Sequence, residues 1–391
     1  MELEDAVAWP FAIGGGVSER QEYLTDSLVP PYGPPQNRKL REAPRTFFQF
    51  DGLESRDNRR WMETLLNANG AGLWHAPVAT DKIQMPVAAD AGDTTILFPT
   101  SNRRFSAGGI AMLIGSGVRD HELVKIESVD ANGLVLDTAL ASAWPAGTVI
   151  TPTIGAHLAQ MPILPRFTGD DAPYSISFRA FEPLEWAPSF GGAVYRTFPV
   201  FEHQIYWDTD PTYTPARSIQ LLDNEVGRVR VYDEAGMVLP LIGFSVTLEG
   251  RAEIGTFRSL LSALSGRWSP IWVPTLAQDI RLKSLNSMTQ LDVAWFGFTT
   301  WPIRANRRDI RIQRRNAAPI YRRIIGSSEI GSETERLVLD SALPVGFSAA
   351  DVTYISFMAL CCQDSDINSL RLWDFDVIES EIAFRGINND F

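Results

Sequence analysis

The chain has 391 residues, of which 45% are apolar and 21% are charged, an ordinary globular composition with room for two to three domains. Its formal net charge of −12 argues against a nucleic acid as the main partner. The acidic N-terminus does not resemble a signal peptide, and no apolar run approaches the roughly 20 residues of a membrane helix. We therefore expect no membrane segment, no specific nucleic-acid contact, and a cytosol-like compartment or export only within a larger particle.

Residues 1–44 are predicted to form an extended N-terminal arm. Trp9-Pro10-Phe11 indicates a short strand, 18–28 a short helix capped by Ser18, and the proline-rich stretch that follows neither. Segments with this proline and glycine content tend to run over a neighbouring surface without building a core of their own. We therefore expect the aromatic side chains of the arm to contact a neighbouring subunit. The candidates are Trp9, Phe11 and Tyr23.

The next segment, 45–183, is predicted to be a β-rich domain with one principal helix. Leu65 and Leu66 belong to an apolar stripe with three- and four-residue spacing, which ends before Gly70. Later in the segment, period-two patterning on both sides of Asn132-Gly133 predicts a β-hairpin. We expect a sandwich or small barrel with the helix packed across it.

Residues 184–242 are predicted to link two domains. The segment is rich in aromatic residues and prolines, and 228–241 indicates a hairpin. The aromatic residues have two interpretations: they bind a domain or a neighbouring subunit, or they form a sugar-stacking face for a cell-surface glycan. The candidates are Trp186, Tyr195, Tyr206, Trp207 and Tyr213.

The last segment, 243–391, repeats the plan of 45–183. A helix again ends in a Leu-Leu turn, at Leu260 and Leu261, and a glycine, an aromatic strand start and a proline follow. We interpret the repeat as one domain used twice, which predicts a mainly β fold with minor α: two similar β-sandwich or barrel-like domains, each with one principal helix. The matched blocks are 48–52 with 246–250, 59–81 with 256–279, 134–140 with 337–343, and 177–179 with 383–385.

An arginine-rich stretch runs from Arg304 to Arg323 in this acidic chain. Ile310 and Ile312 alternate with Arg311, which predicts a strand with one apolar and one cationic face. The cationic face is interpreted either as a dock for an acidic partner or a polyanion, or as a solvated surface balanced by carboxylates of its own domain. Arginine favours an interface because its planar fork pairs bidentately. The candidates are Arg307, Arg308, Arg311, Arg314 and Arg315.

Motifs for catalysis are scarce. The sequence has no P-loop, nucleophile elbow or HExxH motif. The carboxylate pairs Asp208/Asp210 and Asp364/Asp366 allow a glycosidase pair or a calcium loop, but neither continues into the Gly and Glu positions of a calcium loop. We expect the protein not to be an enzyme.

Cysteine and histidine give no sign of a metal site. Cys361 and Cys362 are adjacent, so we expect no disulfide and interpret them as small hydrophobic residues on a strand. The histidines are scattered without metal-ligand spacing, and we expect no metal and no cofactor. They are His75, His121, His157 and His203.

Several short motifs resemble tail-tip proteins of long-tailed bacteriophages. The resemblance covers about 9–85 and, through the repeat, 244–285. It implies a virion structural protein of the distal-tail or baseplate-hub kind. Some related hub proteins hold an iron–sulfur cluster on four cysteines, which the two cysteines here do not support. The motifs are Trp9-Pro10-Phe11, 22–26, 37–45, 48–50, and the helix followed by 74–77.

Together, the resemblance and the repeat imply a homo-oligomeric ring at the tail tip, assembled in the host cytoplasm. The ring would join the tail tube protein to the hub and fibre proteins. Six copies would form a two-tier distal-tail ring, whereas three copies would make a trimeric hub with pseudo-six-fold symmetry. A glycan-binding receptor-recognition module is a further alternative.

Overall fold

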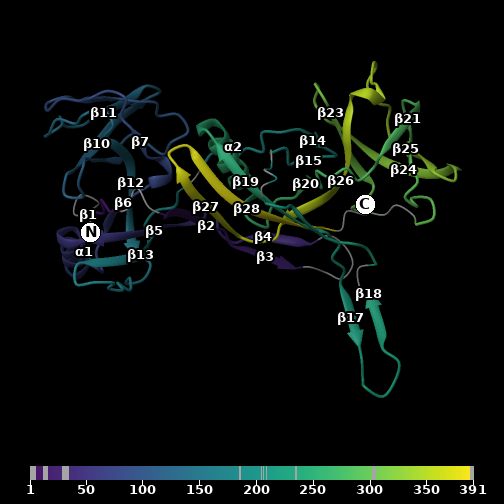
Figure 1. Ribbon diagram of the computed structural model, residues 1–391, viewed down its shortest axis with the longest axis horizontal. Helices are drawn as coiled ribbons and strands as arrows, with labels where there is room; N and C mark the ends of the chain where they lie inside the picture. Colours follow the sequence, from purple (N-terminus) through teal and green to yellow (C-terminus); the bar gives the residue numbers. More distant parts are fainter. Residues whose placement is uncertain are drawn as a thin grey trace.

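The computed structural model describes residues 6–11, 16–28, 35–184, 186–203, 205, 207, 209–233, 236–301 and 305–387. In this part of the chain the fold is mainly β, as predicted, with two α-helices. The molecule is elongated: two β-rich bodies lie at its ends, and a twisted sheet runs between them (Figure 1). We call 45–180 the first unit and 241–387 the second unit.

The first unit contains helix α1, whose buried residues include Met62 and Leu66. The helix ends before Gly70, as the sequence predicts. Its elements are β5 (Arg45–Ser55), α1 (Arg56–Asn69), β6 (Trp74–Pro77), η2 (Ala79–Asp81), β7 (Ile83–Gln84), β8 (Thr95–Leu97), β9 (Ile110–Ile114), β10 (His121–Asp130), β11 (Gly133–Leu136), β12 (Val149–Leu158) and β13 (Asp171–Ala180).

The second unit contains helix α2, which buries Phe257 and Leu261 in the same way. Cys361 and Cys362 lie buried on one of its strands, β26, as the sequence predicts. Its elements are β19 (Leu241–Glu249), α2 (Arg251–Leu264), β20 (Ile271–Pro274), β21 (Leu282–Ser287), β22 (Gln290–Ala294), β23 (Asp309–Arg314), β24 (Ile320–Gly331), β25 (Thr334–Leu339), η3 (Ala349–Asp351), β26 (Val352–Gln363), β27 (Ile367–Asp374) and β28 (Val377–Gly386).

Corresponding strands of the two units pair in the same register. In the first unit, one residue of β12 faces β6 on one side and β9 on the other; in the second unit, one residue of β26 faces β20 and β23. The blocks 134–140 and 337–343 each bury three leucines at the same places. The matched residues are Thr153 with Met358, Pro77 with Pro274, and Ile110 with Asp309.

The register corrects one of the blocks matched by sequence. Phe178 faces Phe48 in the first unit, and Phe384 faces Ile242 in the second. Because Phe178 and Phe384 occupy the same place, Phe48 corresponds to Ile242, four residues before the Val246 that the sequence comparison selected.

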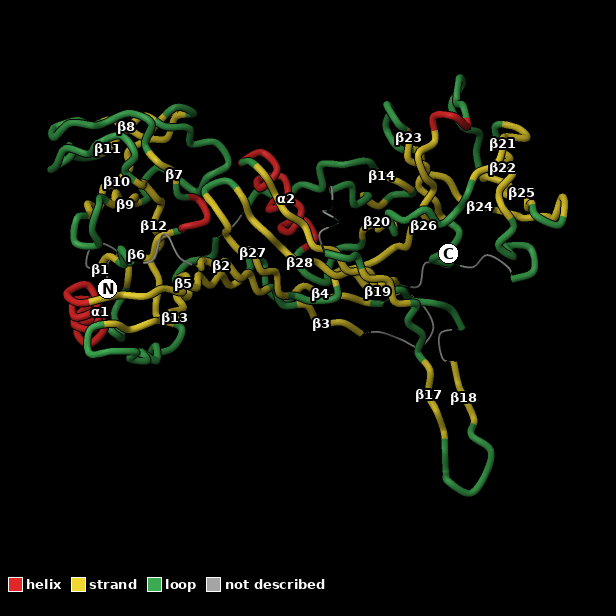
Figure 2. The backbone as a smooth tube through the Cα atoms, in the orientation of Figure 1, coloured by secondary structure: helices red, strands yellow, loops and turns green. Residues whose placement is uncertain are grey.

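Strand β2 (Gly16–Glu22) joins the sheets of the two units. It pairs with β5 on one edge and with β27 on the other, so the sheet continues through the middle of the molecule (Figure 2). The predicted helix over 18–28 is wrong, because burial alternates along β2 with the period of two that is typical of a strand. Ahead of it, β1 (Val7–Ala8) pairs in parallel with β6.

Among the described residues, three two-stranded hairpins lie outside the main sheet, of which β14 (Val194–Tyr195) with β15 (Phe198–Pro199) is the shortest. The first hairpin is β3 (Thr25–Leu28) with β4 (Gln36–Lys39), and the second hairpin is β17 (Ile219–Leu222) with β18 (Arg230–Asp233). The hairpin expected within 228–241 is therefore wrong, because β18 pairs with the strand before it. The second hairpin projects away from the body (Figure 1). The remaining strand is β16 (Thr212–Thr214).

The hairpin predicted around Asn132 is confirmed as β10 and β11, with a turn one residue earlier than expected. Asp130 faces Gly133 directly, so Ala131 and Asn132 form the turn. Gly133 is required by the neighbouring strand, because a Cβ there would lie 2.3 Å from the carbonyl oxygen of Ile96.

Candidate functional site

A buried group of charged residues lies where the two units meet. We call Glu19, Asp81, Arg104, Arg251 and Arg258 the charged clamp. Glu19 comes from β2, Asp81 from the end of η2, Arg104 from a loop of the first unit, and the other two arginines from α2 of the second unit. The side chains of Glu19, Asp81 and Arg258 are completely buried. The clamp therefore ties the N-terminal strand to both units.

Glu19 is at the centre of the clamp. Arg104 binds its carboxylate bidentately, with Nη2–Oε1 of 2.6 Å and Nη1–Oε2 of 2.8 Å. Arg258 bridges the two carboxylates, donating from Nη2 to Glu19 Oε2 at 3.1 Å and from Nη1 to Asp81 Oδ1 at 2.7 Å. Arg251 adds a contact of 3.1 Å to the same Asp81 oxygen. Charge-assisted, bidentate pairs of this kind fix geometry as well as adding energy.

Trp186 covers the clamp. Its ring lies 5.6 Å from Arg104 Cζ and 5.3 Å from Arg258 Cζ, both within cation–π range. The indole Nε1 donates to the carbonyl of Gly255 on α2 at 3.1 Å. This aromatic residue of the 184–242 segment is therefore engaged with arginines and a backbone carbonyl of its own chain.

Burial and the neighbouring charges perturb the ionisation of the clamp. Burial opposes ionisation of Glu19, but Arg104 and Arg258 outweigh it and hold the pKa of this carboxyl well below its usual range. The adjacent Arg103 has its pKa lowered to about 10, first by burial and then by the charge of Arg251. Glu19 accepts hydrogen bonds on both oxygens, so its role is to hold the structure together.

Three predicted interface residues lie inside the chain's own core. Trp9 and Phe11 are completely buried, and Tyr23 is 5% exposed. The ring of Trp9 lies 4.7 Å from that of Phe11 and 5.7 Å from that of Trp74. The expectation that these three side chains contact a neighbouring subunit is therefore wrong. Trp9 and Phe11 belong to the main hydrophobic core, and the backbone N–H of Tyr23 donates to the carbonyl of Asp366 in the second unit at 2.8 Å.

The aromatic candidates of the linking segment divide into buried and exposed residues. Tyr195 is buried, and its hydroxyl donates to Asp309 at 2.8 Å. Trp207 and Tyr213 are 63% and 45% exposed. Tyr206 lies outside the described residues, as does Asp208 of the proposed carboxylate pair. The sugar-stacking interpretation therefore retains Trp207 and Tyr213 from the residues that the structure describes.

The arginine-rich stretch forms the predicted strand, β23, with Ile310 and Ile312 fully buried. Its other face is not a free cationic surface. Arg311 is buried and donates to the hydroxyl of Tyr354 at 2.8 Å, and Arg323 binds Asp309 bidentately at 2.8 and 3.0 Å. Strands β24 and β26 pair with the two edges of β23, and its first four residues are buried.

The other four arginine candidates lie at the ends of β23. Arg307 and Arg315 are exposed, and Arg308 and Arg314 are half-buried. Arg307 stacks 4.8 Å over the ring of Phe357. Arg308 lies 3.9 Å from Asp309, and Arg314 donates to the carbonyl of Ala318. Arg307 and Arg315 are therefore the arginine candidates most open to a partner.

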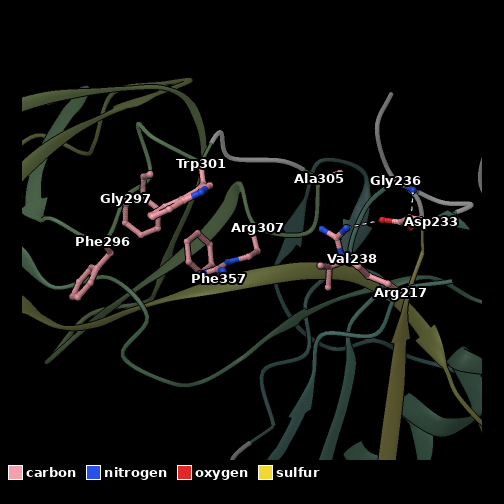
Figure 3. A pocket seen from close by; sticks show the side chains of 11 residues that line it. Arg217, Asp233, Gly236, Val238, Phe296, Gly297, Trp301, Ala305, Arg307 and Phe357 are labelled. Atoms are coloured by element: carbon pink, nitrogen blue, oxygen red, sulfur yellow. Dashed lines mark hydrogen bonds and ion pairs between the residues drawn. The ribbon is translucent and has the colours of Figure 1, made fainter. Parts of the chain in front are cut away.

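A pocket of about 710 Å³ lies beside Arg307. Figure 3 shows Arg307 stacked on Phe357, with Trp301 on one side and the Arg217–Asp233 ion pair on the other. That ion pair, at 2.6 Å, closes the base of the second hairpin. Sequence reasoning missed this pocket, because its lining combines Asp233 of the second hairpin with strands and loops far apart in the chain.

Groups of side chains that could hold a metal ion are absent from the described part of the chain. His157 Nδ1 contacts the carbonyl oxygen of Gly72, and Cys362 has its pKa raised to about 11 by burial. Neither of the two described helices could span a membrane.

Comparison with known proteins adds no relative. No family model matches the chain, and no curated protein matches its sequence.

Proposed function

We propose that this protein is a structural component that assembles into a ring of identical subunits. We further propose that the ring forms part of the tail tip of a long-tailed bacteriophage, of the distal-tail or baseplate-hub kind. The N-terminal motifs support the second step, and the arrangement of the two units supports the first.

The observation that carries the proposal is the repeated strand pairing. Although strand β27 is an addition in the second unit, the main strands of the two units pair in the same register, including Thr153 and Met358 at the same place between two partner strands. Such agreement supports the duplication of one ancestral domain. A chain with two similar domains presents two similar surfaces, which is the property needed to match rings of different symmetry.

The join between the units supports a mechanical role. Strand β2 continues the sheet from one unit to the other, and the charged clamp locks the adjoining loops to α2. A flexible linker would let the units move independently, whereas a shared sheet fixes the angle between them. A fixed angle is what a closed ring requires.

Two assemblies follow from this arrangement. Six copies would make a two-tier ring that extends the tail tube, with the hub and fibre proteins below. Three copies would make a trimeric hub in which six similar units face the tube protein. The shared sheet favours the trimeric arrangement, because it places the two units side by side (Figure 1). Either ring would be assembled in the host cytoplasm and end in the virion.

A glycan-binding module has weaker support. Of the proposed sugar-stacking residues, Trp186 and Tyr195 make their contacts inside the protein. We therefore propose no carbohydrate site, and likewise no catalytic activity, cofactor or metal.

The mass of the purified protein under native conditions tests the proposal. Three or six copies, with the matching symmetry in particle images, would support the hub or the two-tier ring respectively. A stable monomer at all concentrations, with no ring in the particle images, would contradict a ring-forming function. Labelling particles with an antibody against the protein would then test the tail-tip location separately.

A further inference from the structure

The first hairpin is held by the second unit of the same chain. The backbone N–H of Thr25 donates to Asp366 Oδ2 at 2.8 Å, and Asn37 Nδ2 donates to the carbonyl of Arg267 at 2.6 Å. Lys39 adds a cation–π contact, with Nζ 5.4 Å from the ring centroid of Trp268. The receiving surface is therefore the turn after α2 together with the start of β27.

The second hairpin occupies the same place in the second unit as the first hairpin does in the first unit. Thr25 faces Lys39 in one hairpin, and Ile219 faces Asp233 in the other. Ile219 and Asp233 each lie 194 positions after their counterparts in the first hairpin. The strands that precede the hairpins show the same shift, because the pairing of β16 with β19 is that of β2 with β5 moved by 194 positions on both strands.

The second hairpin is more exposed than the first, in which exposed and half-buried residues alternate. β17 is exposed along its whole length, and β18 along all but its last residue. An isolated two-stranded hairpin is marginally stable in water. Seven large apolar side chains on it are at least 46% exposed: Ile219, Leu221, Leu222, Val226, Val229, Val231 and Tyr232. β16 likewise pairs only with β19 among the described strands, whereas its counterpart β2 pairs on both edges.

The first unit carries the counterpart of the receiving surface, and it too lies open. The turn after α2 corresponds to the turn after α1, at 70–72. The end of β26 and the start of β27 correspond to the end of β12 and the segment that follows, at 157–167. Three apolar side chains stand out from that segment: Met161, Ile163 and Phe167 are 60%, 84% and 75% exposed.

We propose that the second hairpin of one copy docks on this surface of the first unit of a second copy, as the first hairpin docks on the second unit within a chain. In the same contact, β16 of one copy lies along 161–167 of the next. The inference rests on the proposed ring assembly and names its subunit contact. It does not depend on where in a virion the ring lies.

The chemistry of the two contacts differs in a way that fits this assignment. The polar pair Thr25 and Asp366 within the chain is replaced between copies by Ile219 and Met161. The polar contact of Asn37 with Arg267 is replaced by Val231 near Ala71. An apolar hairpin therefore meets an apolar surface, whereas the polar first hairpin meets a polar one. This difference disfavours exchange of the two hairpins.

The contact is head-to-tail, because the hairpin and its receiving surface lie at opposite ends of the molecule (Figure 1). Each copy therefore gives one contact and receives one. Because the contact repeats the relation already present between the two units, successive units are related by a constant rotation, and such a series closes into a ring when the rotation divides a full turn.

Cysteine cross-linking of the full chain tests the contact. We would introduce V231C and A71C together and treat the assembled protein with a short bis-maleimide. Wild type is the blank, because Cys361 and Cys362 are buried. The matched control pairs A71C with V345C, since Val345 is fully exposed in a loop away from the hairpin. We expect a ladder of covalent oligomers that ends at the copy number of the ring, and none from the control.

A charge variant gives an independent measurement. V231D should shift the protein to monomers, whereas V345D should leave the native mass unchanged. Rings that form without the 231–71 ladder, or that survive V231D, would overturn the docking contact but leave the ring proposal standing. A protein that is monomeric before any substitution would overturn both. Equal cross-linking by the control pair would also overturn the docking contact.

Discussion

Removing the charge of Glu19 should weaken the protein far more than removing a similar charge three residues away. Arg104 and Arg258 both donate to the Glu19 carboxylate, at 2.6 to 3.1 Å, and all three side chains are at most 8% exposed. Glu19→Gln keeps the shape but leaves two buried guanidinium groups with less opposing charge. Breaking a buried ion pair in this way costs about 3–5 kcal/mol, and we expect a loss of that size in the free energy of unfolding.

Urea denaturation followed by tryptophan fluorescence would measure the effect. The matched control is Glu22→Gln on the same strand, where the carboxylate lies 3.1 Å from Arg20 and the side chains are 25% and 47% exposed. Exposed pairs contribute about 0–1 kcal/mol. If the two variants lose the same stability to within about 1 kcal/mol, the clamp does not hold the two units together and the reasoning fails.

Three further outcomes are expected. The pKa of Glu19 is lowered in the folded state, so below about pH 4.3 the unfolded state binds a proton at this carboxyl more readily than the folded state does. The stabilisation by the Glu19 carboxylate should therefore be lost as the pH falls below about 4.3, by at most about 1.4 kcal/mol per pH unit. Glu19→Gln should flatten that part of the plot of unfolding free energy against pH. Trp9→Ala should cost about 3–5 kcal/mol in thermal or urea unfolding, whereas exposed Trp207→Ala should have little effect; equal effects would contradict the core position of Trp9. Finally, burial raises the pKa of Cys361 and Cys362, so both thiols should resist iodoacetamide at about pH 8 until urea unfolds the chain; rapid alkylation of the native protein would contradict their burial.

The sequence predicted the elements whose pattern is local. The helix ending at Gly70 and the hairpin on either side of Asn132 follow from residues within a few positions of one another. The apolar face of β23 was also correct, because Ile310 and Ile312 alternate with polar residues. Such patterns survive in the fold because the apolar side chains of these elements pack into the hydrophobic cores.

Strand β2 was missed because its burial pattern contradicts residue type. Val17, Glu19 and Gln21 point inward, so two of three inward residues are polar. A buried glutamate is tolerated only when paired, and its partners Arg104 and Arg258 lie 85 and 239 residues away. No local rule contains that information, and the helix prediction followed from the local sequence alone.

The same physical reason explains the errors at the candidate interfaces. Trp9 and Phe11 are aromatic residues in a segment rich in proline and glycine, and such residues serve equally well on a partner's surface or in their own core. Arg311 belongs to a strand whose outward face is covered by Tyr354 of β26. Which of these surfaces stays open depends on pairing partners that only the complete fold specifies.

The position of β2 also constrains how the chain is made. Val17 faces Leu372, so β2 leaves the ribosome long before its partner strand β27 is synthesised. Until then, the outer edge of β2 presents unpaired backbone groups, an arrangement that invites pairing with other chains. A chain truncated before β27 would keep this open edge permanently and would tend to aggregate. Synthesis of β27 therefore closes this edge before the subunit assembles.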